Sequence, residues 1–232
     1  MNKKTGLQLY YSRIFFLRSE MDRLLSLSIL FSCILTLARI IYTGRLTFVS
    51  LVWNLFLAFV PYFITQQLQR KPQWIQSKSI FVFFFLLWLL CIPNAFYIIT
   101  DLFHLGDQRN DYMVPQWYDL ALILSFVWNG LLLGILSVRQ MEKITENFFP
   151  RRTELFFLYP VMWLNALGVY VGRYLRFNSW DIITNPFQLG RDIANILLHP
   201  IAYRFAWGMI FCFSILMTLM YMTIKKISKT IH

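Results

Sequence analysis

The chain has 232 residues, of which 58% are hydrophobic and only 14% are charged, against roughly 25% charged residues in an average soluble domain. A soluble fold of this size could not cover so much apolar surface, so the composition excludes an ordinary soluble domain and favours a membrane protein. The formal net charge of +11 does not indicate nucleic-acid binding, because the basic residues lie in short stretches between apolar runs.

Six apolar runs have the length of about 20 residues that a helix needs to cross the hydrocarbon core of a bilayer. We therefore predict an all-α, polytopic transmembrane helix bundle of about six spans. The predicted spans are 24–42, 46–65, 79–100, 117–138, 154–174 and 201–224. They form one membrane domain, 24–224, between a basic cytoplasmic segment, 1–23, and a basic cytoplasmic tail, 225–232. Segment 1–23 is either an interfacial amphipathic helix or a simple basic flank.

The distribution of Lys and Arg predicts the orientation of the spans. One side of the bundle, formed by both termini and by the loops 66–78 and 139–153, holds 15 of the 22 basic residues. The positive-inside rule places this side in the cytoplasm. All the Glu residues lie there too, so we predict that the inner side is a solvated surface that carries both positive and negative side chains. The acids of the outer side are all Asp and its bases are all Arg, which favours fixed, bidentate contacts.

Seven polar residues fall within the predicted spans, and their positions are skewed toward the outer side. They are Arg39, Asn54, Asn94, Asp119, Asn129, Asn165 and Arg173. Polar side chains at membrane depth face the bundle interior and often mark function. They therefore predict a polar cavity that is open to the outside. The alternative is structural, since Arg near a helix end reaches the head groups and Asn hydrogen-bonds to a neighbouring helix.

The third span and the loop after it carry the first group of candidate site residues. Asn94 and Asp101 share a face if the helix continues past Pro93, and His104 lies one turn further on. Asp101, His104 and Asp107 also form an oxygen and nitrogen ligand set for a divalent metal. Because no motif of the HExxH kind is present, no metal site is predicted.

The fifth span carries the second group of candidates. Asn165, Arg173 and Arg176 fall on one helical stripe. Two arginines on an inward stripe need anions, which either the nearby Asp residues or a ligand phosphate could supply.

Two GxxxG motifs, at 130–134 and 168–172, allow close helix packing. We expect them to pack within the chain, and the alternative is a dimer face. The short connection between the fourth and fifth spans predicts that these two spans are antiparallel neighbours. Asn129 and Asn165 would then meet in the middle of the bundle. Further along, the amphipathic pattern of 191–198, followed by Pro200, predicts a short interfacial helix in the last outer loop. It either roofs the cavity or is a plain surface helix.

Three segments together resemble a known family. They are Pro93-Asn-Ala-x-Tyr-x-x-Thr-Asp-Leu-x-His-Leu105, then Trp117-Tyr-Asp-Leu with Ser125-Phe-x-Trp-x-Gly-Leu131, then Gly172-Arg-Tyr-Leu-Arg-Phe-Asn-Ser-Trp-Asp181. The chain from about Phe81 onward resembles the bacterial membrane proteins of the domain of unknown function 1361 family. The resemblance implies a multi-pass protein of the bacterial plasma membrane. It implies no activity and no role for any residue.

These observations lead to three hypotheses for function. In the first, an outward-facing cavity binds an anionic lipid or a polyprenyl-phosphate-type ligand, whose phosphate Arg173 and Arg176 hold. The other residues assigned to the ligand are Asn94, Asn165 and Asp181. If the site is catalytic, the candidate bases or metal holders are Asp101, His104 and Asp119. The second hypothesis is a non-enzymatic membrane subunit that braces a partner protein, and the third is a small transporter. The sequence does not identify a cofactor.

Overall fold

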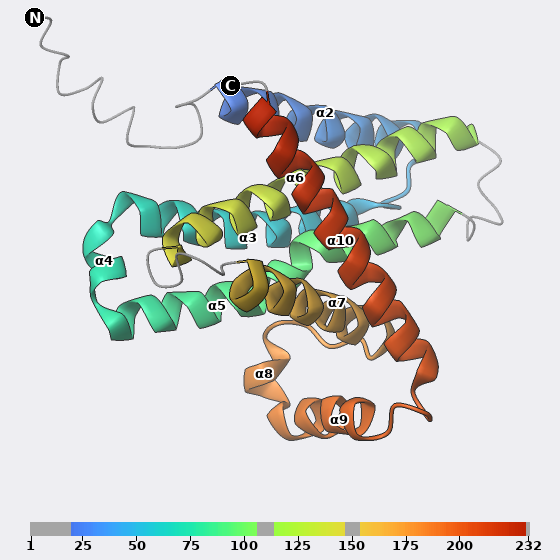
Figure 1. Ribbon diagram of the computed structural model, residues 1–232. Helices are drawn as coiled ribbons and strands as arrows, with labels where there is room; N and C mark the ends of the chain where they lie inside the picture. Colours follow the sequence, from blue (N-terminus) through green and yellow to red (C-terminus); the bar gives the residue numbers. More distant parts are fainter. Residues whose placement is uncertain (1–19, 106–113, 147–153, 231–232) are drawn as a thin grey trace, which may run out of the picture.

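The computed structural model describes residues 20–105, 114–146 and 154–230, and within these ranges all regular structure is helical (Figure 1). The long α-helices are α2 (Glu20–Thr43), α3 (Val49–Arg70), α5 (Lys78–Tyr97), α6 (Gln116–Thr145), α7 (Tyr159–Tyr174) and α10 (Arg204–Thr230). The shorter elements are α4 (Pro72–Gln76), the 3₁₀ helix η1 (Ile98–Leu105), the π-helical turn η2 (Glu154–Leu158), α8 (Asp181–Thr184) and α9 (Pro186–Leu198). The all-α fold class is therefore confirmed.

Five helices of the described chain are long and apolar enough to cross a membrane. They are Met21–Thr43, Val49–Arg70, Lys78–Leu105, Gln116–Thr145 and Arg204–Ser228, which correspond to five of the six predicted spans. The fifth predicted span, 154–174, is helical throughout, but η2 shortens its α-helix to the 16 residues of α7. A sixth crossing by this segment stays a prediction, as do the orientation of the bundle in the membrane and the bounds of the basic segments 1–23 and 225–232.

Side-chain contacts show which helix ends lie together. At one end of the bundle, Arg39 near the end of α2 bonds Asp119 near the start of α6. At the other end, hydrogen bonds join the C-terminal parts of α3, α6 and α10: Thr65 to Gln140, and Lys225 to Glu142. The end that holds Arg39 is the one predicted to face outward, and we call it the outer end.

Helix α5 lies between α6 and α7, and the two GxxxG motifs both contact it. A Cβ atom on Gly130 or Gly134 of α6 would lie closest to Ile98, Ala95 and Phe96. A Cβ atom on Gly168 would meet the Pro93 ring, and one on Gly172 would meet Tyr97. The motifs therefore pack within the chain, as expected, but their partner is α5. The prediction that they bring the fourth and fifth spans directly together is wrong.

The two mid-bundle asparagines consequently have different surroundings. The amide of Asn129 donates to the Ser32 hydroxyl on α2 and to the Ser125 carbonyl, each at 2.9 Å. Asn165 on α7 is fully buried, and its amide has no hydrogen-bond partner within the described chain. The predicted meeting of Asn129 with Asn165 is not found, because the α5 helix separates the two glycine motifs.

The segment between α7 and α10 contains the predicted amphipathic helix, which extends over α9, from Pro186 to Leu198 (Figure 1). The Trp207 indole of α10 donates to the Ile196 carbonyl at 2.9 Å and so attaches α9 to the bundle. Ile196 faces inward, whereas Phe187 and Leu198 are 89% and 74% exposed. Large exposed apolar side chains suit a helix in contact with lipid, and its interfacial position remains a prediction.

The close approach of α7 to α5 generates a test. A Cβ atom on Gly168 would lie 2.6 Å from the Pro93 ring, which is rigid and cannot rotate away. We expect Gly168→Ala to destabilise the protein in detergent by about 1–3 kcal/mol, the usual cost of overpacking. The matched control is Gly208→Ala, since a Cβ atom at Gly208 of α10 meets nothing within 4 Å. Thermal unfolding measures both variants, and equal melting temperatures would contradict the packing described here.

Candidate functional site

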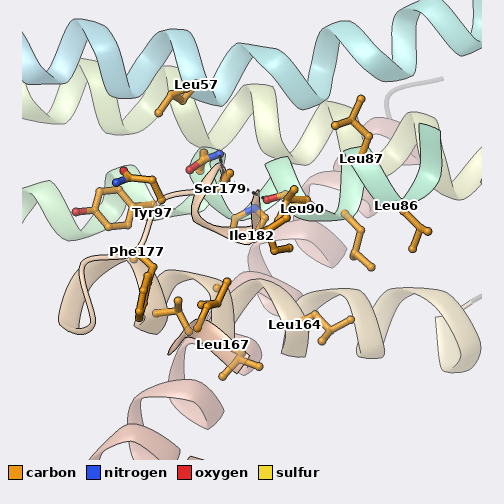
Figure 2. Close-up of a pocket in the computed structure, with 18 of the residues that line it drawn as sticks. Leu57, Leu86, Leu87, Leu90, Tyr97, Leu164, Leu167, Phe177, Ser179 and Ile182 are labelled. Atoms are coloured by element: carbon orange, nitrogen blue, oxygen red, sulfur yellow. Dashed lines mark hydrogen bonds between the residues drawn. The ribbon is translucent and has the colours of Figure 1, made fainter. Parts of the chain in front are cut away.

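A cavity of about 710 Å³ lies between α3, α5 and α7 and is covered by the segment after α7 (Figure 2). Its walls are mainly apolar. Figure 2 shows Leu57 of α3 on one side, Leu86, Leu87 and Leu90 along α5, and Leu164 and Leu167 on α7. A volume of this size is in the range of small-molecule and lipid sites. The sequence predicted a polar cavity, but the described lining contains no charged side chain.

The lining along α5 extends from Phe83 to Tyr97, which is about 21 Å at the helical rise of about 1.5 Å per residue. That length exceeds the roughly 15 Å depth of one hydrocarbon leaflet. The amides and the serine hydroxyl of the lining gather toward the outer end: Asn54, Asn94, Asn178 and Ser179. The cavity therefore has a long apolar part and a short polar end.

Asn94 and Ser179 build one side of the polar end. α5 continues as a helix through Pro93, as the shared face of Asn94 and Asp101 requires. The Asn94 amide donates to the Ser179 hydroxyl at 3.0 Å, and that hydroxyl donates to the Leu90 carbonyl at 3.4 Å. A helical carbonyl has two lone pairs, so the Leu90 carbonyl can accept this bond from a distant segment in addition to its helical one. The chain after α7 is thereby attached to α5 over the cavity.

Asn54 connects the cavity to a buried group of charges. Its amide donates to Asp101, at 2.9 Å, from α3 to η1. The other carboxylate oxygen of Asp101 lies 3.8 Å from the guanidinium of Arg173, which also lies 3.3 Å from the ring of His104 and faces Phe103. Asp101 is only 3% exposed. The sequence predicted Asp101 and His104 as neighbours and left the anion for Arg173 open between an Asp and a ligand phosphate. In this structure Asp101 lies closest to that role.

A second charge pair closes the outer end between α2 and α6. The Arg39 guanidinium bonds both oxygens of Asp119, at 2.7 and 3.1 Å, and the Arg39 side chain is fully buried. The Phe48 ring packs on Arg39 at 4.6 Å. This bidentate geometry is what the pairing of Asp with Arg on the outer side predicted. Two of the three candidate bases, Asp101 and Asp119, are thus engaged in ion pairs. Neither of them lines the cavity.

The remaining two candidate ligand residues, Arg176 and Asp181, lie outside the cavity lining. Helix α7 ends at Tyr174, and Arg176 is exposed with a left-handed φ of 60°. Arg176 therefore does not extend the stripe of Asn165 and Arg173. Asp181 accepts bonds from the Asn178 backbone N–H at 2.6 Å and the Thr184 hydroxyl at 2.9 Å. These bonds hold the pKa of Asp181 below its ordinary value, and they give it a role in the turn before α8.

The metal alternative concerned Asp101, His104 and Asp107. Asp107 lies outside the described residues, together with the rest of 106–113. Among the residues that the structure describes, no group of three or more His, Cys, Asp or Glu side chains could hold a metal ion. The described part of the chain therefore offers no geometry for a metal centre.

Sequence reasoning missed a buried polar cluster at the opposite end. Glu142 of α6 is fully buried and accepts bonds from Arg139, from the Tyr221 hydroxyl and from Lys225 at 2.8 Å. The expectation of a solvated inner surface is therefore wrong at Glu142. The available signal was the i,i+3 spacing of Arg139 and Glu142, together with Tyr221 and Lys225 at i,i+4 on α10. No pattern in the sequence pairs α6 with α10.

The Arg39–Asp119 pair generates a double-mutant test. We expect Arg39→Leu or Asp119→Leu alone to cost about 3–5 kcal/mol of unfolding free energy, because each leaves an unmatched buried charge. The double change should cost much less than the sum of the single changes. Denaturant unfolding in detergent micelles measures the cycle, with Arg191→Leu on the exposed face of α9 as the control. Additive effects would show that the two charges do not stabilise each other.

The inner cluster generates a second stability test. Glu142→Ala leaves Arg139 and Lys225 without their shared carboxylate, so we expect a loss of about 3 kcal/mol. Glu146→Ala, four residues later, directly after α6 ends, and exposed, should change stability by less than about 0.5 kcal/mol. The same unfolding measurement compares the two variants. An unchanged unfolding free energy in Glu142→Ala would refute the stabilising role of this cluster.

Comparison with known proteins identifies one matching family. No curated protein and no solved structure matches the chain. The family model described as "Protein of unknown function (DUF1361)" matches residues 53–223. This range contains every residue that lines the cavity, along with Asp101 and Arg173, and it leaves out α2. Because the match covers well over half of the chain, the protein belongs to the DUF1361 family, as the three outer segments indicated.

Proposed function

We propose that the protein binds a membrane amphiphile in the cavity between α3, α5 and α7. The observation that carries this proposal is the division of the lining into a long apolar part and a polar outer end. A ligand of matching form would place a hydrocarbon chain along α5 and its head group beside Asn54, Asn94 and Ser179. Such a site gains most of its affinity from apolar burial and its orientation from a few polar contacts.

The ligand would enter from the bilayer. Several lining residues are also exposed at the surface of the bundle: Trp53 is 53%, Phe83 is 62% and Leu86 is 58% exposed. All three are apolar, so the rim of the cavity on this side suits contact with lipid chains better than contact with water. A lipid already dissolved in the membrane reaches such an opening by lateral diffusion.

The predicted anionic ligand, a phospholipid or a polyprenyl phosphate, would need Arg173 to turn from Asp101 toward the cavity and the exposed Arg176 to turn inward. In the present geometry Arg173 supports the site indirectly, through Asp101 and Asn54. Catalysis by Asp101, His104 or Asp119 receives less support than binding, because a base must reach its substrate and both Asp side chains are buried in ion pairs.

A second candidate is a non-enzymatic subunit that braces a partner membrane protein. The observation that favours it is the mutual pairing of the outer charges, Arg39 with Asp119 and Arg173 with Asp101. The small-transporter alternative is weaker, since the polar residues at the inner end are bonded to one another. For either role we place the protein in the bacterial plasma membrane, with six spans, both termini cytoplasmic and α9 at the outer interface.

Photo-crosslinking tests the binding site. The full chain, in phosphatidylcholine nanodiscs, is exposed to hexadecanol, hexadecyl phosphate and palmitate, each with a diazirine in its tail. We expect at least one probe to label 83–97 and 164–172 saturably. Leu90→Trp, which fills the cavity, should weaken that labelling about tenfold, equivalent to about 1.4 kcal/mol.

The control variant is Leu30→Trp on α2, whose side chain is 55% exposed and does not line the cavity. It should leave the labelling of α5 and α7 unchanged. If the labelling of α5 and α7 rises linearly with probe concentration, as annular lipid contacts do, the cavity is not a binding site.

A further inference from the structure

The hydrogen bonds at the polar end fix the orientation of the Asn54 amide. Its NH₂ group donates to Asp101, and a carboxylate accepts only, so the opposite assignment of nitrogen and oxygen is excluded. The Asn54 carbonyl oxygen has no hydrogen-bond partner in the described chain and is not sealed from the surface. Because Asn54 lines the cavity, this oxygen is an acceptor available to a ligand.

The hydrogen bonds of Ser179 fix the orientation of the Asn94 amide. The Ser179 hydroxyl has one proton, and it donates that proton to the Leu90 carbonyl. In this geometry the hydroxyl accepts from Asn94 at 3.0 Å, so the group of Asn94 that faces Ser179 is its NH₂. The Asn94 carbonyl oxygen is left as a second acceptor without a partner among the described residues.

Each of the two amides retains one N–H and a carbonyl oxygen with two lone pairs. The amide of Asn178 is turned to Asp181. The other lining groups with a polar proton are the Trp53 indole and the Tyr97 hydroxyl, and Tyr97 lies at the edge of the cavity in Figure 2. The polar end therefore combines two strong acceptors with a few neutral donors, and no lining side chain carries charge.

This set of groups selects against a phosphate. A phosphate accepts hydrogen bonds, so the two carbonyl oxygens would face its lone pairs, and its charge would lie in an apolar cavity without a cation. A hydroxyl both donates and accepts, and it matches an amide that offers an oxygen and an N–H. From this complementarity we propose that the head group is an uncharged hydroxyl, so that the ligand is a long-chain lipid alcohol. This inference rests on the proposed function and names the class of its ligand.

Competition between head groups on one common tail tests the inference with the unmodified protein. The diazirine-tailed hexadecanol labels the full chain in nanodiscs, and unlabelled hexadecanol, hexadecyl phosphate or hexadecyltrimethylammonium competes. We expect hexadecanol to compete for the labelling of 83–97 at least tenfold better than either charged compound. The tail is constant, so the difference reports the head group alone.

Variants of the polar end assign the effect to named residues. Asn94→Leu removes an acceptor and should weaken competition by hexadecanol about tenfold while leaving the weak competition by hexadecyl phosphate unchanged. Asn195→Leu, the same change on α9 outside the cavity lining, is the matched control. If Asn94→Leu fails to fold, Asn94→Asp keeps the oxygen acceptors and should retain the preference for the alcohol over the phosphate.

The outcomes separate the inference from the proposed function. Saturable labelling with a preference for hexadecyl phosphate would overturn the hydroxyl assignment and leave the cavity as an anion-tolerant lipid site, in which Arg173→Leu should then abolish binding. A preference for the trimethylammonium head would also overturn it. If no probe labels the cavity saturably, the proposed function fails and the inference fails with it.

Discussion

Polar side chains inside this bundle depend on one another, because hydrocarbon offers neither hydrogen-bond donors nor acceptors. The consequence is visible at both ends. Arg39 and Asp119 join α2 to α6, and Arg173 with Asp101 joins α7 to η1. At the opposite end, Glu142 joins α6 to α10. These pairs connect helices that are distant in sequence. The need of buried polar side chains for bonding partners therefore also determines which helices pack together.

The position of α5 explains where the cavity forms. Glycines of α6 approach one side of α5 and glycines of α7 approach another, near Pro93 and Ile98. Pro93 and Gly168, which make the closest of these contacts between α5 and α7, border the cavity together with the leucines at 86, 87 and 90 of α5. The segment after α7 then returns to α5 through Ser179 and covers the outer end.

The sequence predicted the properties that depend on residues close along the chain. Apolar run length predicted the helices, and i,i+3 spacing predicted Asp101 and His104 as neighbours. The helix continues past Pro93, but Asn94 lines the cavity and Asp101, in η1, does not. Pairing between distant helices was harder to predict. GxxxG motifs indicate close approach but do not name the partner, so α6 and α7 were paired with each other when each packs on α5. Glu142 was assigned to solvent because nothing in the sequence placed α10 beside it.

The same reasoning separates the two kinds of polar residue at the outer end. Charged side chains are costly in an apolar bundle and are stable there when paired, which removes them from chemistry with a ligand. A primary amide can satisfy one partner and still present an oxygen, because it has more hydrogen-bonding positions than one contact uses. Asn54 is placed for this, since its amide donates to Asp101 and its residue also lines the cavity. In the proposed site the charges therefore stabilise the frame, and the neutral amides would carry the recognition.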